Sequence, residues 1–173
     1  YIEEFLGGFD EKMKLSIVVC AYNEEKSIGN LFQNLPFQRL LPEIRDYEII
    51  VVASGCTDRT VPIVREFMAK NSRIKLIKEE ERLGKSEALN KALAAASGEY
   101  IALIPSDVVP TRDGLYHLLF PLRDEKTVVV SGRPVQDPRH KRGGLVGYLA
   151  HMTYRIWSRL MVVLNDEGTA GHC

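Results

Sequence analysis

The sequence predicts an α/β fold with a mainly parallel, twisted sheet and helices on both of its faces. Short β-branched apolar runs alternate along the chain with stretches of about ten residues whose apolar positions recur at helical spacing. This alternation implies right-handed crossovers between parallel strands. The 173 residues are 45% hydrophobic and 27% charged, a composition typical of a globular domain and not of a disordered or fibrous chain.

The first half of the chain contains two predicted strand-helix units. Residues 15–20 and 47–53 are apolar runs of the kind found in strands that are buried on both faces. Each run precedes apolar residues at helical spacing: Ile28, Leu31, Phe32 and Leu35 in the first unit, and Ile63, Val64, Phe67 and Met68 in the second. Pro36 closes the first helix, whereas Pro62 is tolerated because it falls in the first turn of the second.

The second half continues the pattern with shorter elements. Strands are expected at residues 73–78, 100–104 and 127–130. Two helices separate them, with apolar residues Ala88, Leu89, Ala92, Leu93 and Ala96 in the longer and Leu115, Leu118 and Leu119 in the shorter. Gly98 is placed as the glycine cap of the longer helix, and Pro121 ends the shorter one.

Charge, cysteine content and hydropathy exclude several classes of protein. The formal net charge is zero, which excludes a nucleic-acid-binding protein that works by bulk charge. The three cysteines are widely spaced and predict neither a disulfide framework nor a thiolate zinc site. Charges interrupt the most apolar stretch, 145–164, so that no membrane span or signal peptide is predicted. We expect a cytoplasmic protein, attached to the cytoplasmic face of a membrane if segments outside this sequence anchor it.

Ligands of parallel sheets bind beyond the carboxyl ends of the strands, which directs attention to residues 22–25, 54–60, 79–86 and 105–111. In the last of these loops, Asp107 follows an apolar strand and is flanked by prolines. A carboxylate there could hold Mg²⁺ or Mn²⁺ together with substrate phosphates, because these cations prefer hard oxygen ligands. The alternative is that Asp107 caps a turn or the following helix.

The third loop is basic at its end. Lys85 follows Arg82 and Gly84 just before a predicted helix, whose free N–H groups and dipole favour an anion. Lys85 is therefore a candidate diphosphate contact, unless residues 79–82 are simply a solvated charged face. The sequence has neither a P-loop nor a G-x-G-x-x-G fingerprint, which disfavours ordinary NTPases and dehydrogenases.

The first two loops carry aromatic and hydrogen-bonding groups. Tyr22 offers a ring on which a nucleobase could stack, and Asn23 and Glu24 offer hydrogen bonds. Glu24 could equally be a charge in the first turn of the next helix. In the second loop, Asp58 or Thr60 is expected to cap the helix that it precedes.

Together these segments resemble the family 2 glycosyltransferases of the GT-A fold. The resemblance rests on four motifs in the family's order, at residues 16–25, 48–60, 84–90 and 98–107. It implies a nucleotide-diphosphate-sugar donor, a divalent metal (Mg²⁺ or Mn²⁺) and, in most members, inversion at the sugar carbon. The donor-site residues that the resemblance implies are Ala21, Tyr22, Asn23, Glu24, Ser54, Lys85, Ser106 and Asp107, with Asp107 also on the metal.

The chain departs from the family pattern at two positions. Ala53 and Pro105 stand where the family often has acids, so only Asp107 remains of an Asp-x-Asp pair. The general base of the family would lie beyond Cys173, and no catalytic residue is assigned within the sequence. These departures raise a second hypothesis, a non-catalytic nucleotide-sugar-binding or assembly module. A third hypothesis is a nucleotidyltransferase. It would need a glycine-rich basic loop after the first strand, and residues 22–25 are not such a loop.

Three regions are predicted: an N-terminal extension at residues 1–14, a nucleotide-sugar-binding domain at 15–132, and the start of an incomplete acceptor-side region at 133–173. Residues 131–160 hold six Lys/Arg and one acid. Apolar residues at helical spacing within 139–164 indicate an amphipathic helix, which either packs on the sheet or lies on a membrane surface. We expect a lipid phosphate or polysaccharide acceptor, as in the synthesis of cell-envelope polysaccharides.

Overall fold

A computed structural model describes residues 13–124 and 126–132. The chain divides into two units, residues 1–130 and 131–173, and all the elements described here belong to the first. In chain order they are β1 (Met13–Ala21), α2 (Ile28–Asn34), η1 (Leu35–Phe37), β2 (Ile44–Ser54), α3 (Thr60–Met68), β3 (Ile74–Glu79), α4 (Lys85–Ala95), β4 (Tyr100–Leu103), α5 (Gly114–Leu119) and η2 (Phe120–Arg123). The predicted basic segment and amphipathic helix at residues 133–173 lie outside the described residues.

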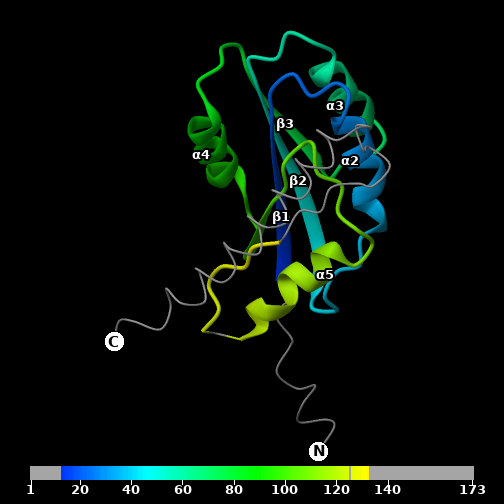
Figure 1. Ribbon diagram of the computed structural model, residues 1–173, viewed down its shortest axis with the longest axis vertical. Coiled ribbons are helices and arrows are strands. Elements are labelled where there is room, and N and C mark those ends of the chain that lie inside the picture. Colours follow the sequence, from blue (N-terminus) through cyan, green and yellow to red (C-terminus); the bar gives the residue numbers. More distant parts are fainter. Residues whose placement is uncertain (1–12, 125, 133–173) are drawn as a thin grey trace, which may run out of the picture. The chain divides into compact units, whose positions relative to one another are not determined.

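The strands form one parallel sheet in the order β3-β2-β1-β4. Helix α4 covers one face of the sheet, and α2 and α3 lie on the other, as Figure 1 shows. Because the strands are parallel, their carboxyl ends meet at one edge, and the loops after β1, β2 and β3 gather there at the top of Figure 1. The predicted α/β architecture with helices on both faces is confirmed.

Alternation along β1 and β2 divides the buried side chains between two cores. The larger core lies under α2, α3 and α5, and the smaller one lies under α4. The larger contains Leu15, Ile17, Val19, Ile49 and Val51 from the strands, and the smaller contains Val18, Ile50 and Val52 with Ala88 and Ala92 of α4. A strand that supplies apolar side chains to both faces must be a continuous apolar run, which is why residues 15–20 and 47–53 were recognisable as strands.

The fifth predicted strand, residues 127–130, is wrong. Within the described part of the chain these residues form no strand, and Val128 and Val129 are 85% and 83% exposed. A run of β-branched residues becomes a strand only where a neighbouring strand pairs its backbone groups and a core takes its side chains. Neither condition is met for 127–130 among the residues described.

Gly98 does not cap α4, as the sequence had suggested. The helix ends at Ala95, and the cap residue Ala96 has extended backbone. Gly98 instead lies against β1, where a Cβ atom would come within 2.6 Å of the Ser16 nitrogen and 2.7 Å of the Lys14 carbonyl oxygen. The absence of a side chain is therefore required for the connection between α4 and β4 to cross β1.

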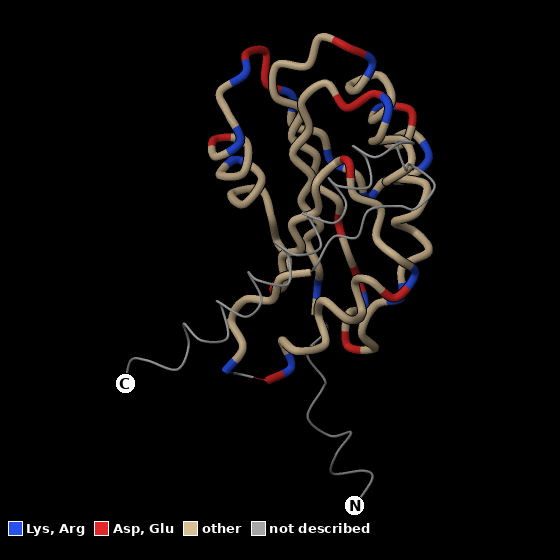
Figure 2. Tube along the Cα trace, viewed as in Figure 1, with Lys and Arg blue, Asp and Glu red and all other residues tan. Residues whose placement is uncertain are grey.

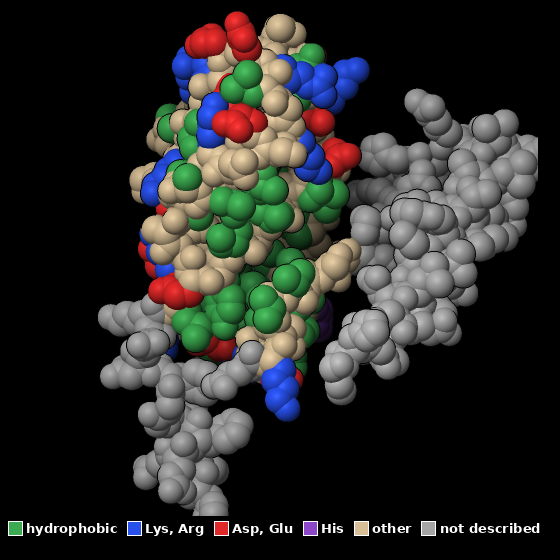
Figure 3. All heavy atoms as spheres, turned by 90° about the vertical axis from the view of Figure 1, so that its left-hand side faces the viewer, with side chains coloured by type: hydrophobic (Ala, Val, Ile, Leu, Met, Phe, Trp, Pro, Cys, Tyr) green, Lys and Arg blue, Asp and Glu red, His purple; other side chains and the backbone are tan. Residues whose placement is uncertain are grey.

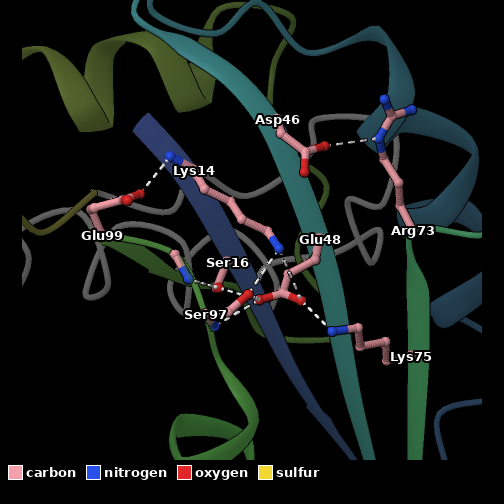
Figure 4. A network of polar contacts seen from close by, with 9 residues as sticks. Lys14, Ser16, Asp46, Glu48, Arg73, Lys75, Ser97 and Glu99 are labelled. Atoms are coloured by element: carbon pink, nitrogen blue, oxygen red, sulfur yellow. Dashed lines mark hydrogen bonds and ion pairs between the residues drawn. The ribbon is translucent and has the colours of Figure 1, made fainter. Parts of the chain in front are cut away.

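A buried carboxylate holds this same end of the sheet together. Glu48, in β2, is 3% exposed, and its Oε1 accepts hydrogen bonds from the Ser16 hydroxyl and from the N–H and hydroxyl of Ser97, each at 2.8 Å. Its Oε2 lies 2.6 Å from Nζ of Lys75 and 3.8 Å from Nζ of Lys14. Figure 4 shows these groups converging on Glu48 from the two neighbouring strands, β1 and β3, and from the α4–β4 connection. Elsewhere, few charged residues lie along the middle of the strands (Figure 2).

Burial alone would raise the pKa of Glu48. The hydrogen bonds from Lys75, Ser97 and Ser16 outweigh that effect and lower the pKa from 4.5 to about 2. Glu48 is therefore charged and satisfied at neutral pH, and it ties the α4–β4 connection to β1, β2 and β3.

Large hydrophobic side chains are exposed along the edge strand β4, where Ile101 and Leu103 are 42% and 53% exposed. Figure 3 shows hydrophobic side chains gathered on the face of the molecule that includes α4.

None of the helices in the described residues is both long and apolar enough to span a bilayer.

Candidate functional site

The first two loops at the carboxyl edge are joined by hydrogen bonds from the backbone of one to side chains of the other. The N–H of Glu24 donates to Thr60 Oγ1 at 2.7 Å, and the N–H of Glu25 donates to Asp58 Oδ2 at 3.0 Å. In the opposite direction, the N–H of Thr57 donates to Asn23 Oδ1 at 2.8 Å. The side chains of one loop thus satisfy the backbone of the other, and the two loops form a single rigid rim.

These contacts change the roles expected for several polar residues. Asp58 Oδ1 accepts a hydrogen bond from the N–H of Thr60, the first residue of α3, but the cap position belongs to Arg59, whose side chain makes no capping bond. Asn23, with a φ of 54°, uses its side-chain oxygen on Thr57. Glu24 precedes α2, so the interpretation as a first-turn helix charge is wrong, and its Oε2 accepts from the Ser27 hydroxyl at 2.5 Å.

The third loop lies against the other two through Arg82. The guanidinium carbon of Arg82 is 3.9 Å from the centroid of the Tyr22 ring, a cation–π contact on a side chain that is 40% exposed. Gly55 has a φ of +59°, and a Cβ there would come within 2.6 Å of the Arg82 nitrogen. Only glycine fits between the second and third loops. Arg82 therefore covers one face of the ring on which we expected a nucleobase to stack, a contact that no sequence spacing indicates.

The last residues of β2 and β3 form a buried polar pair. Ser54 and Glu79 are partners in the strand register, and Lys91 of α4 places its Nζ 2.6 Å from Glu79 Oε1. The pKa of Glu79 is lowered, first by the hydrogen bond from Lys91 and then by the Ser54 hydroxyl. Glu79 is 6% exposed, so the interpretation of residues 79–82 as a solvated charged face is wrong at this residue. No sequence pattern indicates a buried acid at this position.

Lys85 is exposed and begins α4, directly after Gly84, whose φ is 96°. Burial raises the pKa of Cys20, near the end of β1. The positive charge of Lys85 acts in the opposite direction, but its effect on this pKa is smaller. Burial also raises the pKa of Cys56. Raised pKa values argue against an activated nucleophile at either thiol. Lys85 thus adds positive charge to a helix N-terminus that faces the same edge as Tyr22.

Asp107 is exposed in the turn that follows β4, and Ser106 beside it is buried. The residue at the N-terminal cap of α5 is Asp113, so Asp107 does not cap that helix. Among the described residues, its carboxylate has no hydrogen-bonding or ion-pair partner, and no cluster of three or more acidic, histidine or cysteine side chains could hold a metal ion without help. An exposed, unengaged carboxylate fits a Mg²⁺ or Mn²⁺ ion whose other ligands are diphosphate oxygens and water.

The parallel sheet with helices on both faces matches the fold of solved GT-A glycosyltransferases. Among solved structures, the mannosyltransferase PcManGT from Pyrobaculum calidifontis, in complex with GDP-Man and Mn²⁺, matches with a TM-score of 0.64 and 31% identity over 76% of this chain and 38% of that one. TarS 1-349 of S. aureus, in complex with UDP-GlcNAc, matches with a TM-score of 0.56 and 28% identity over 72% of this chain and 37% of that one.

Residues 16–164 match the family described as "Glycosyl transferase family 2", and the chain belongs to this family. A beta-monoglucosyldiacylglycerol synthase of Nostoc sp. is 30% identical over 83% of this chain and 31% of the relative. The probable glycosyltransferase YdaM of Bacillus subtilis is 35% identical over 76% of this chain and 32% of the relative. The chain therefore spans about a third of the length of these relatives.

Proposed function

We propose that this chain is the donor-binding part of a glycosyltransferase that moves a sugar from a nucleotide diphosphate to an acceptor. The observation that carries the proposal is the arrangement of the carboxyl edge. The loops after β1, β2 and β3 gather there, and these loops and the turn after β4 carry an aromatic ring (Tyr22), an exposed cation at a helix N-terminus (Lys85) and an unengaged carboxylate (Asp107). These are groups suited to a base, a diphosphate and a metal ion respectively.

In this proposal some of the predicted site residues contact the donor or its metal ion, and the others support the loops that carry them. Tyr22 stacks on the base, Lys85 neutralises the diphosphate, and Asp107 holds Mg²⁺ or Mn²⁺. Ala21 and Ser54 end β1 and β2 beneath the donor, and Ser106 shapes the turn that presents Asp107. Asn23 and Glu24 keep the rim rigid through the hydrogen bonds that they make to Thr57, Thr60 and Ser27.

The chemistry that follows is direct displacement at the sugar carbon, with inversion. A divalent cation on Asp107 would offset the charge that develops on the leaving diphosphate. Lys85 contributes to the same neutralisation from the helix N-terminus. The base that removes the proton of the acceptor hydroxyl is expected beyond Cys173, and an acceptor that is itself a phosphate needs no strong base.

The acceptor that we propose is a lipid or a growing saccharide of the cell envelope. Relatives named as a monoglucosyldiacylglycerol synthase and as a poly-beta-1,6-N-acetyl-D-glucosamine synthase favour this class of substrate. A membrane surface would be met through residues 139–164, and the protein would act at the cytoplasmic face of the membrane. The second candidate is a non-catalytic nucleotide-sugar-binding module, favoured by the fully buried Ala53 and by Pro105 where acids would be expected.

Replacing Asp107 with asparagine is expected to weaken Mn²⁺-dependent binding of a nucleotide-sugar donor roughly ten- to a hundredfold, because a charged metal ligand is lost. Isothermal titration of UDP, GDP and their sugar conjugates, with and without Mn²⁺, measures this effect. The matched control is Asp46→Asn, an exposed acid at the opposite end of the sheet, which should bind like the wild type. Equal Mn²⁺ dependence in Asp107→Asn and the wild type would refute the metal-binding role.

A further inference from the structure

The connection from β4 to α5, residues 104–113, is held at both ends by other parts of the fold. In the described chain these residues form neither a helix nor a strand. At the start, the N–H of Ile104 donates to the Val18 carbonyl oxygen at 2.9 Å, which continues the pairing of β4 with β1. Near the far end, Gln38 donates from Nε2 to the Pro110 carbonyl oxygen at 3.2 Å.

The carboxamide of Gln38 has a second partner. Its Oε1 accepts the N–H of Leu115 at 3.5 Å, one of the first N–H groups of α5, which lack acceptors inside the helix. The next residue, Arg39, donates its N–H to the Arg112 carbonyl oxygen at 2.9 Å. Among the described residues outside the connection and α5, these two form the hydrogen bonds that hold the far end, and only Gln38 does so through its side chain.

Asp107 lies in the middle of this connection, between two neighbours that face inward. Ser106 is buried and Val108 packs against the larger core, whereas Asp107 is exposed. Pro105 and Pro110 each fix their own φ, so that the backbone on both sides of Asp107 has few ways to adjust. A displacement at Pro110 is therefore passed on to Asp107 and is not absorbed between them.

We propose that Gln38 is a positioning residue for the metal ion of the donor site. Its hydrogen bonds set where the Asp107 carboxylate lies, and thereby how tightly Mg²⁺ or Mn²⁺ binds together with the nucleotide. The described residues contain no ready-made cluster of metal ligands, so the ion depends on Asp107 with diphosphate oxygens and water. A site of this kind weakens when its ligand moves by more than about 0.5 Å. The inference rests on the proposed function and adds to the site a residue outside its four loops.

The test removes both hydrogen bonds with Gln38→Met, which keeps the length and the unbranched shape of the side chain. Isothermal titration measures the affinity for UDP and for GDP, and the ratio of the affinity with Mn²⁺ to that without is the Mn²⁺ enhancement. We expect an enhancement about tenfold smaller than in the wild type. The affinity without Mn²⁺ should change by less than about twofold. The matched control Gln33→Met, exposed in α2, should behave like the wild type in both respects.

A double-mutant cycle shows whether Gln38 acts through Asp107. In the Asp107→Asn background the carboxylate is already absent, so Gln38→Met should cause no further loss of the enhancement. A role limited to the packing of α5 would lower the thermal stability of Gln38→Met without changing the Mn²⁺ enhancement of the folded protein.

Gln38→Glu separates the two hydrogen bonds and serves as a second variant. Its carboxylate still accepts the N–H of Leu115 but cannot donate to Pro110, so it should lose the enhancement as Gln38→Met does. The backbone bond from Arg39 remains in both variants, so the connection shifts and does not detach.

An unchanged enhancement in Gln38→Met or in Gln38→Glu overturns the inference while the proposed function stands. A further tenfold loss in the Asp107→Asn background overturns it as well. If Asp107→Asn and the wild type show equal enhancement, the metal-binding role fails. If no nucleoside diphosphate binds with or without Mn²⁺, the proposed function fails. In either of these two cases the inference fails with it.

Discussion

Replacing Glu48 with alanine is expected to destabilise the fold by about 3 kcal/mol, a large part of the total for a domain of this size. The change leaves the Ser16 hydroxyl and the N–H of Ser97 without their acceptor at the point where the α4–β4 connection crosses β1. Lys75 and Lys14 are partly exposed and regain water, which limits the loss. Chemical denaturation at pH 7 measures the free energy of unfolding.

The matched control for Glu48→Ala is Asp46→Ala, on the same strand. The Asp46 carboxylate is 59% exposed and lies 3.6 Å from Arg73, a surface pair that contributes little. The control should change stability by less than about 0.5 kcal/mol. Similar effects of the two substitutions would contradict the structural role given to Glu48.

The low pKa of Glu48 also predicts how this contribution depends on pH. A carboxyl whose pKa falls from 4.5 to about 2 on folding stabilises the protein fully above pH 4.5 and loses that stabilisation as the pH falls toward 2. At about 1.4 kcal/mol per pH unit, the full contribution is roughly 3 kcal/mol. The difference in stability between the wild type and Glu48→Gln should therefore shrink between pH 5 and pH 2. A constant difference would contradict the assignment.

Gly98→Ala is the second substitution with a large expected effect, a loss of about 2 to 3 kcal/mol. The new Cβ would lie within 3 Å of three backbone atoms of β1, and backbone in the middle of a parallel sheet cannot give way as a flexible side chain does. The hydrogen bond from the N–H of Gly98 to Ser16 Oγ would be strained at the same time. Thermal unfolding monitored by circular dichroism gives the change.

Gly29→Ala, in helix α2, is the control for Gly98→Ala. A Cβ at Gly29 would meet only Ile63 Cγ2, at an ordinary contact distance of 3.8 Å. Because alanine favours the helix over glycine, this variant should be more stable by about 0.5 to 1 kcal/mol. Destabilisation by Gly29→Ala, or tolerance of Gly98→Ala, would disagree with the packing described.

The elements that the sequence predicted correctly are those whose signals are local. Residues 15–20 and 47–53 are continuous apolar runs because each strand faces a core on both sides. Residues 127–130 carry a similar β-branched signal, but a strand also depends on a partner that the run itself does not specify. Gly98 follows a helix and resembles a cap, whereas its actual constraint is contact with Ser16, which is 82 residues away.

The candidate site was predictable in position but not in its internal contacts. The strand ends pointed to the loops that carry Tyr22, Lys85 and Asp107, because parallel strands end at one edge. The stacking of Arg82 on Tyr22 and the burial of Glu79 depend on how loops from different strands pack, and charge alone suggested that Glu79 was solvated. Long-range contacts of this kind leave no periodic signal in one sequence.

We propose above all that a nucleotide diphosphate and a metal ion bind at the carboxyl edge of the sheet. Paramagnetic broadening of amide signals in the ¹⁵N-labelled protein, on addition of Mn²⁺ with UDP, tests it most directly. We predict broadening for the amides around Tyr22, Gly84 and Asp107 and unchanged signals around Glu48 and Ser97 at the opposite edge. Broadening centred on Glu48 and Ser97, or none at the carboxyl edge, would contradict the account.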